Sequence, residues 1–135
     1  MSGDSFFHRF FAALDSGDDA AAMALVADDL EFAILWAPDA GRNSRHFTGG
    51  PDQLRAFTVA GEIEGWGHHI LHVSRTGSTE VALGETRWDD GGHIGTFVCA
   101  AQLDADGLMR RYLVGRSPSL QFATEMMSSQ STIIP

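Results

Sequence analysis

The sequence predicts one α+β domain in which three helices from the first half pack on a curved, mostly antiparallel sheet. Its second half shows four consecutive strand patterns, at 68–76, 79–89, 93–104 and 108–117. The connectors are short and rich in Gly, Asp and Ser, as in tight reversals, so neighbouring strands must run antiparallel. A chain of 135 residues with 44% hydrophobic residues is suited to a single core.

Composition excludes several classes of function. The net charge of −9 would repel nucleic acid and anionic membrane surfaces. The single cysteine cannot form an intrachain disulfide, and no lysine is present for Schiff-base chemistry. The N-terminal residues carry no signal-peptide pattern, and no apolar run has transmembrane length. We therefore expect a soluble cytoplasmic protein.

The first half alternates helix and strand patterns. Ser5 or Asp4 can cap a first helix, whose phenylalanines form a wide apolar stripe over 6–14. Pro51 in the first turn marks the start of another helix. This third helix should end near Gly61. The other elements expected here are a second helix over 18–27, a strand over 30–37 and a short strand over 45–48.

Four local motifs resemble ketosteroid isomerases in their order and spacing. They are the segments 10–18 (FFAALDSGD), 24–29 (ALVADD), 47–49 (FTG) followed by 54–57 (LRAF), and 104–109 (DADGLM). The match covers about residues 5–117 and implies an NTF2-like (cystatin-like) cone of the SnoaL-like kind. We accordingly expect a domain over 1–118, a partly flexible tail over 119–135, and a homodimer through the outer face of the sheet.

The resemblance also implies that the steroid-isomerase mechanism is absent. The tyrosine, base and second carboxyl positions of ketosteroid isomerases fall on Phe10, Ile34 and Cys99. None of these side chains can replace the original acid or base. The carboxylate position of SnoaL-type cyclases falls near Val114, which carries no acid either.

The interior of such a cone would be apolar and aromatic. Two interpretations stay open: a cavity with a few polar anchors, or a fully packed core. The residues expected to line it are Phe10, Phe32, Ile34, Trp36, Phe57, Thr86, Trp88, Phe97, Cys99 and Val114.

Three side chains are the first candidates for chemistry. His72 lies between Leu71 and Val73 and is the histidine expected to reach the interior, as a proton carrier or as a hydrogen-bonded wall residue. Tyr112 and Arg116 share a strand face and could polarise a ligand oxygen. The alternatives are a core tyrosine and a surface ion pair.

The register near Glu85 leaves a second ambiguity. If Thr86 faces inward, Glu85 and Arg87 face outward, and only a one-residue shift would make Glu85 a buried general base. On one strand His68 and His72 would stand roughly 13 Å apart, too far to bind one metal. Cys99 has no adjacent base, so an inert buried thiol is expected.

Two functions are compatible with these features. The first is a cofactor-free isomerase, dehydratase or cyclase that binds a compact apolar or aromatic molecule, because neither a phosphate-binding Gly loop nor a metal set is recognisable. The second is a non-catalytic ligand-binding or dimeric partner module, which the missing carboxylates favour. Shifted pKa values inside a cavity would favour the enzyme. A cavity lined only by apolar atoms, or filled by phenylalanine and tryptophan side chains, would favour the module.

Overall fold

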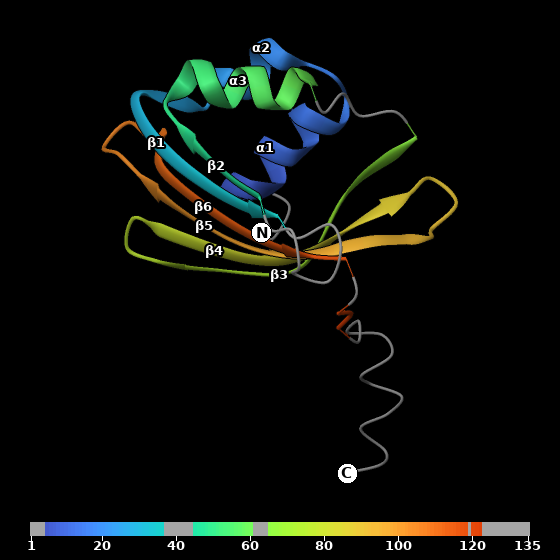
Figure 1. Ribbon diagram of the computed structural model, residues 1–135. Coiled ribbons are helices and arrows are strands. Elements are labelled where there is room, and N and C mark those ends of the chain that lie inside the picture. The colour runs from blue at the N-terminus through green and yellow to red at the C-terminus, as the bar shows by residue number, and fades with distance from the viewer. Residues whose placement is uncertain (1–4, 37–44, 61–64, 119, 123–135) are drawn as a thin grey trace.

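The computed structural model describes residues 5–36, 45–60, 65–118 and 120–122 (Figure 1). Helices cover one face of a curved sheet, which confirms the α+β prediction. The helices are α1 (Phe6–Asp15), α2 (Asp19–Met23) and α3 (Pro51–Ala60). The strands are β1 (Val26–Trp36), β2 (Arg45–Gly49), β3 (Trp66–Thr76), β4 (Thr79–Trp88), β5 (His93–Leu103) and β6 (Met109–Ser117).

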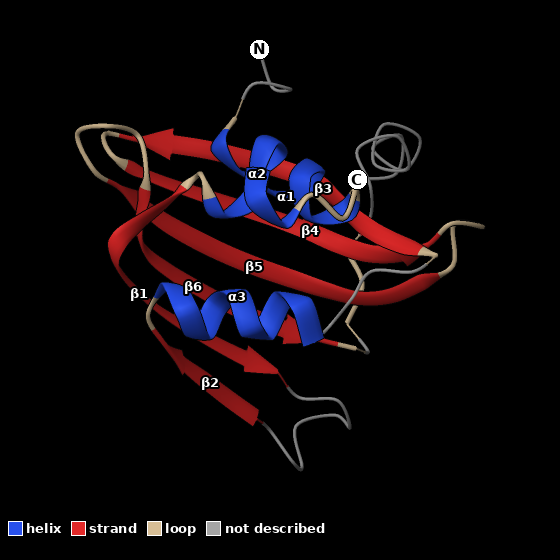
Figure 2. Cartoon of the chain, turned by 90° about the horizontal axis from the view of Figure 1, so that it is seen from above, coloured by secondary structure: helices blue, strands red, loops and turns tan. Residues whose placement is uncertain are grey.

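The six strands follow the order β2-β1-β6-β5-β4-β3. All neighbouring pairs are antiparallel except β1 and β6, which are parallel. Seen from above, α1 and α2 lie over the β3–β4 side and α3 lies over the β1–β6 side (Figure 2). We call the face covered by these helices the inner face and the opposite one the outer face.

Helix α1 begins where the sequence predicts. Ser5 is its N-cap, and the Ser5 hydroxyl accepts a hydrogen bond from the His8 N–H at 3.0 Å. The aromatic stripe of α1 is fully buried, and its rings stack along the helix: Phe6 on Phe10 at 5.8 Å and Phe7 on Phe11 at 5.5 Å. This stripe fills the space between the helix and the sheet.

The boundary between α2 and β1 differs from the prediction. Helix α2 ends at Met23, and β1 already begins at Val26 instead of residue 30. Val26 pairs with Met109 of β6, and the Met109 N–H donates to the Leu25 carbonyl at 2.9 Å. This long-range pairing overrides the helix propensity of the alanine-rich segment.

Three positions that the resemblance aligns with catalytic residues of ketosteroid isomerases lie together in the buried core. Phe10 of α1, Ile34 of β1 and Cys99 of β5 belong to one cluster of buried side chains.

Among the described residues, no helix is long and apolar enough to cross a membrane. Of the expected tail, only residues 120–122 are described, and the rest of 119–135 lies outside the described residues.

Candidate functional site

An acid and a histidine form a close pair at one end of the inner face. The His68 Nδ1–H donates to Asp15 Oδ1 at 2.6 Å, and the His68 backbone N–H donates to Asp15 Oδ2 at 2.8 Å. Because an ionised carboxylate can only accept, this geometry places the proton of a neutral imidazole on Nδ1 and leaves Nε2 as a base. The last residue of α1 thereby orients a side chain of β3.

Aromatic rings surround the imidazole. The Phe11 ring stacks on His68 with centroids 4.4 Å apart and planes 7° apart. Phe97 meets it edge-on at 5.7 Å, and Trp66 lies at 5.4 Å. The His68 side chain is 13% exposed and that of Asp15 is 25% exposed. Little water therefore reaches the pair, which strengthens the electrostatic interaction between the two groups.

Two more polar groups lie on the same face. Thr86 of β4 is the cross-strand partner of His68, and the Arg116 Nη2 donates to the Thr86 hydroxyl at 3.4 Å. Burial lowers the pKa of Arg116 from its usual value, and interaction with Tyr112 opposes this. His68, Thr86 and Arg116 therefore form a line of potential hydrogen-bond donors and acceptors across the inner face.

Tyr112 lies on the inner face, as expected, but deep in the core. Its ring contacts Phe7 at 6.1 Å and Phe10 at 5.7 Å. Burial, with a smaller contribution from Cys99, raises its pKa well above the usual value. At neutral pH the phenol therefore stays protonated, which suits a core tyrosine.

The expectation that His72 reaches the interior is wrong, since His72 is exposed. The pairing of β3 with β4 shifts by one residue between Ile70 and His72. This β-bulge reverses the alternation, so that Val73 instead of His72 packs against the core. The sequence around Leu71 carries no glycine or proline that would indicate the bulge.

Glu85 is buried, although the one-residue register shift that we expected its burial to require does not occur. Thr86 faces inward as predicted, yet Glu85 is only 1% exposed on the other face. The Arg87 Nε donates to Glu85 Oε1 at 2.6 Å, while the buried Oε2 has no hydrogen-bond partner among the described residues. Glu85 lies on the opposite side of the sheet from Asp15 and His68 and is separated from their chemistry.

The predicted lining residues are mostly core residues. Trp88 is an exception, because it is 50% exposed beside the turn at Gly92, and the side chain of Trp36 lies outside the described residues. Phe57 packs against the core and Thr86 is buried. The remaining members are all buried in the core: Phe10, Phe32, Ile34, Phe97, Cys99 and Val114.

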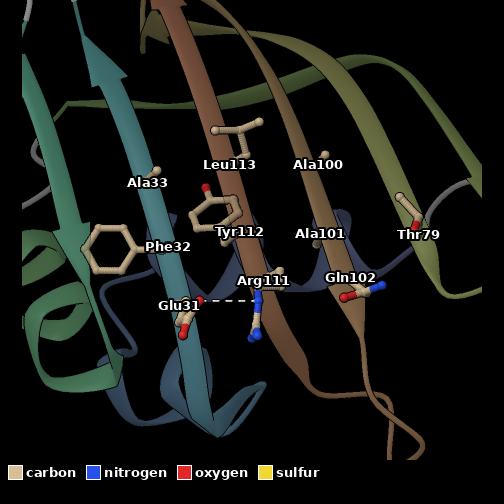
Figure 3. A pocket seen from close by; sticks show the side chains of 10 residues that line it. All are labelled: Glu31, Phe32, Ala33, Thr79, Ala100, Ala101, Gln102, Arg111, Tyr112 and Leu113. Atoms are coloured by element: carbon tan, nitrogen blue, oxygen red, sulfur yellow. Dashed lines mark ion pairs between the residues drawn. The ribbon is translucent and has the colours of Figure 1, made fainter.

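An open hollow of about 350 Å³ lies elsewhere, on the outer face over β1, β6 and β5 (Figure 3). Glu31 and Arg111 form an ion pair at 3.5 Å at its edge. Neither Asp15 nor His68 lines this hollow. We therefore place the candidate site at Asp15 and His68, because the residues that line the hollow include no acid paired with a histidine.

Other reactive groups contribute little to the site. Burial raises the pKa of the Cys99 thiol far above its usual value, so the thiol is not a nucleophile at neutral pH. Within the described part of the chain, no three His, Cys, Asp or Glu side chains gather in a way that could hold a metal ion. The site residues that sequence reasoning missed, Asp15 and His68, are adjacent only in the fold.

Solved structures with a similar fold come from several bacteria. A proposed isomerase of the SnoaL-like family from Agrobacterium tumefaciens has a TM-score of 0.63 at 10% identity, over 82% of this chain and 93% of that one. An NTF2-like protein of unknown function from Burkholderia xenovorans has a TM-score of 0.63 at 16% identity, over 92% and 88%. A proposed ketosteroid isomerase from Kribbella flavida has a TM-score of 0.57 at 18% identity, over 87% and 78%. No protein-family model and no curated protein matches the sequence.

Proposed function

Because the chain has the NTF2-like fold shared by SnoaL-like and ketosteroid isomerase-like proteins, we propose that it is a cofactor-independent acid–base enzyme. Its reaction is of the isomerase, dehydratase or cyclase type, on a compact apolar or aromatic molecule. His68, and not His72, moves the proton. The observation that carries this proposal is the 2.6 Å hydrogen bond between His68 Nδ1 and Asp15 Oδ1.

The proposed mechanism uses Asp15 to orient and stabilise His68. Asp15 holds the Nδ1–H, so that Nε2 can remove a proton from a carbon or oxygen of the substrate. The carboxylate then stabilises the imidazolium that forms. Phe11 stacks on the imidazole ring, so the substrate approaches along the plane of the ring, at the Nε2 edge.

Arg116 and Thr86 supply the complementary role. When a proton leaves carbon next to a carbonyl, negative charge develops on the carbonyl oxygen. A half-buried guanidinium bonded to the Thr86 hydroxyl is suited to stabilise that oxygen, since charge-assisted hydrogen bonds strengthen where water is scarce. Tyr112 lies in the same core and contributes to the electrostatic environment of Arg116.

We test the proposal by proton exchange, which needs no knowledge of the natural substrate. In D₂O, 1-tetralone, 2-cyclohexen-1-one and cyclohexanone serve as probes, and ¹H NMR follows exchange at the carbon next to the carbonyl. We expect the protein to accelerate exchange of at least one probe. His68→Gln should lower the rate by about 10²-fold or more, the usual contribution of a general base.

His72→Gln is the matched control, because His72 is an exposed histidine of the same strand. It should keep the exchange rate within about twofold of the unaltered protein. Loss of exchange in His72→Gln with retention in His68→Gln would overturn the assignment. Exchange no faster than in buffer for all three ketones would reject carbon-acid chemistry.

We also propose that the partner at the outer face is a second copy of the chain. Leu35, Val81, Val98 and Leu113 are large exposed apolar side chains, and strand alternation places them together on that face. The ion pairs Glu31–Arg111 and Glu85–Arg87 flank this apolar band on its two sides. A twofold copy would therefore meet apolar side chains with apolar side chains.

A further inference from the structure

The Asp15 carboxylate lies against the backbone of β3 at the start of that strand. Its two oxygens accept hydrogen bonds from one residue, Oδ2 from the His68 backbone N–H and Oδ1 from Nδ1–H, at 2.8 and 2.6 Å. A carboxylate bonded to both the main chain and the ring of one residue has little freedom to rotate. Its position therefore determines the position of the imidazole ring.

Gly67, directly before His68, leaves the space for this contact. A Cβ on Gly67 would lie 3.1 Å from Asp15 Oδ2 and 3.3 Å from Asp15 Cγ. These separations are shorter than ordinary van der Waals contacts. Gly67 is not among the described glycines with positive φ, so its backbone is accessible to other residues. The reason for glycine here is space and not conformation.

Neither Asp15 nor Gly67 is a favourable residue for the secondary-structure element in which it lies. Asp15 is the last residue of α1, where the helix dipole disfavours a negative charge. Glycine inside a strand such as β3 packs no side chain and weakens the strand. Two neighbouring departures from local preference, at one contact, indicate a functional constraint.

We propose that Gly67 is a positioning residue for the Asp15–His68 pair. By having no side chain it admits the Asp15 carboxylate to the β3 backbone, which fixes His68 in the Nδ1–H tautomer with Nε2 as the base. This inference rests on the proposed role of His68 in proton transfer. It adds a residue that acts through Asp15 and touches no substrate.

The first test is the tautomer of His68 in Gly67→Ala. The added methyl group should displace the carboxylate by a few tenths of an ångström and weaken the bond to Nδ1. The ¹⁵N chemical shifts of the imidazole should then change from those of a single Nδ1–H tautomer to an average of both tautomers. Proton exchange of the ketone probes should fall on the order of tenfold, because small misplacements of catalytic groups lower rates strongly.

Gly115→Ala is the matched control. Gly115 also lies within a strand and has no positive φ, but a Cβ added there meets no atom of the described part of the chain within 4 Å. This variant should keep the single His68 tautomer and the exchange rate of the unaltered protein. A change in Gly115→Ala equal to that in Gly67→Ala would mean that any alanine in the sheet disturbs His68, and would overturn the proposal.

A double-mutant cycle tests whether Gly67 acts through Asp15. Asp15→Asn should change the His68 tautomer by itself, and adding Gly67→Ala should then change the exchange rate by less than twofold. Full additivity of the two effects would contradict the proposal. If Gly67→Ala does not fold, Asp15→Ala with Gly67→Ala restores the space. Recovery of the fold in that double variant supports the contact, and failure to recover overturns it.

The two proposals fail in distinguishable ways, because the tautomer measurement needs no substrate. A tautomer change in Gly67→Ala without catalysed exchange in the unaltered protein would keep the positioning role and reject the enzymatic function. An unchanged single tautomer in Gly67→Ala would reject the positioning role, whatever the exchange rates are.

Discussion

At the scale of single residues, the chemistry proposed for this protein depends on contacts between side chains that are far apart in the sequence. Asp15 and His68 are separated by 53 positions and meet at 2.6 Å. His69 and His72 are exposed on the same strand. Residue type therefore does not distinguish among the six histidines of the chain. What distinguishes His68 from the other histidines is its hydrogen bond to a carboxylate at a largely buried position.

Cys99 allows a prediction about stability and pH. Burial holds the pKa of its thiol above the usual value in the folded chain. The unfolded chain therefore loses this proton first, once the pH rises above about 8.5. Because the unfolded state then binds fewer protons, the free energy of unfolding should fall by up to about 1.4 kcal/mol per pH unit between pH 9 and 10. Urea unfolding across this range measures the slope.

Cys99→Ala removes the thiol and should flatten that slope. The comparison uses slopes and not absolute stabilities, because the substitution also removes buried volume. Tyr112 has a raised pKa as well and adds its own loss of stability above about pH 10, so the window ends there. Equal slopes for the two proteins between pH 9 and 10 would show that the thiol ionises in the folded state.

At the scale of secondary-structure elements, a carboxylate of β4 holds the start of α1. Glu80 is buried, and its oxygens accept from the Phe7 N–H at 2.8 Å and the Phe6 N–H at 3.2 Å. Arg75 Nη1 lies 3.7 Å from the same carboxylate. These bonds satisfy amides that have no partner inside the helix, and the negative charge complements the helix dipole.

Glu80→Gln should destabilise the protein by about 2–3 kcal/mol. The glutamine has no negative charge, and hydrogen bonds to a charged acceptor are stronger than those to a neutral one. Its NH₂ group would also be placed close to the N–H donors that now bind the carboxylate. Urea unfolding at pH 7 measures the change. Glu31→Gln is the control, because the Glu31 side chain is 75% exposed and its pair with Arg111 should contribute less than about 1 kcal/mol. Equal losses in both variants would mean that Glu80 does not anchor α1.

The bulge in β3 is another effect at this scale. Up to Ile70 the strand alternates so that His68 and Ile70 face the helices. One extra residue at Leu71 then turns Val73 inward and His72 outward. A prediction based on uninterrupted alternation is therefore correct for the first residues of β3 and wrong for those after the bulge.

At the scale of the whole molecule, the outer face of the sheet gives a prediction about assembly. We expect sedimentation velocity to show a dimer, and Leu113→Arg to convert it to a monomer. Leu113 is 54% exposed in the apolar band, and an arginine there would place two unpaired charges in a twofold interface. Gln102→Arg, an exposed change at the polar edge of the same face, should leave the dimer intact. A monomer at micromolar concentrations of the unaltered protein would reject the dimer.

The sequence by itself determined the elements whose signals are local. The Gly, Asp and Ser connectors gave the four-strand meander, whose strand ends agree with the structure within two residues. The hydroxyl of Ser5 and the phenylalanine stripe predicted α1, and Pro51 predicted the start of α3. Capping, turn chemistry and periodicity act within a few residues, so they can be recognised without knowledge of the fold.

Tertiary structure decided everything that depends on distant partners. The parallel pairing with β6 extended β1 to Val26, and the bulge moved His72 out of the interior. Glu85 is buried although it faces outward, as the sequence predicted for an inward Thr86. The end of α1 brings Asp15 to His68 beside Gly67. These outcomes depend on which strand lies beside which, and on space left by a missing side chain. Such long-range contacts have no counterpart in the spacing of residues along the chain.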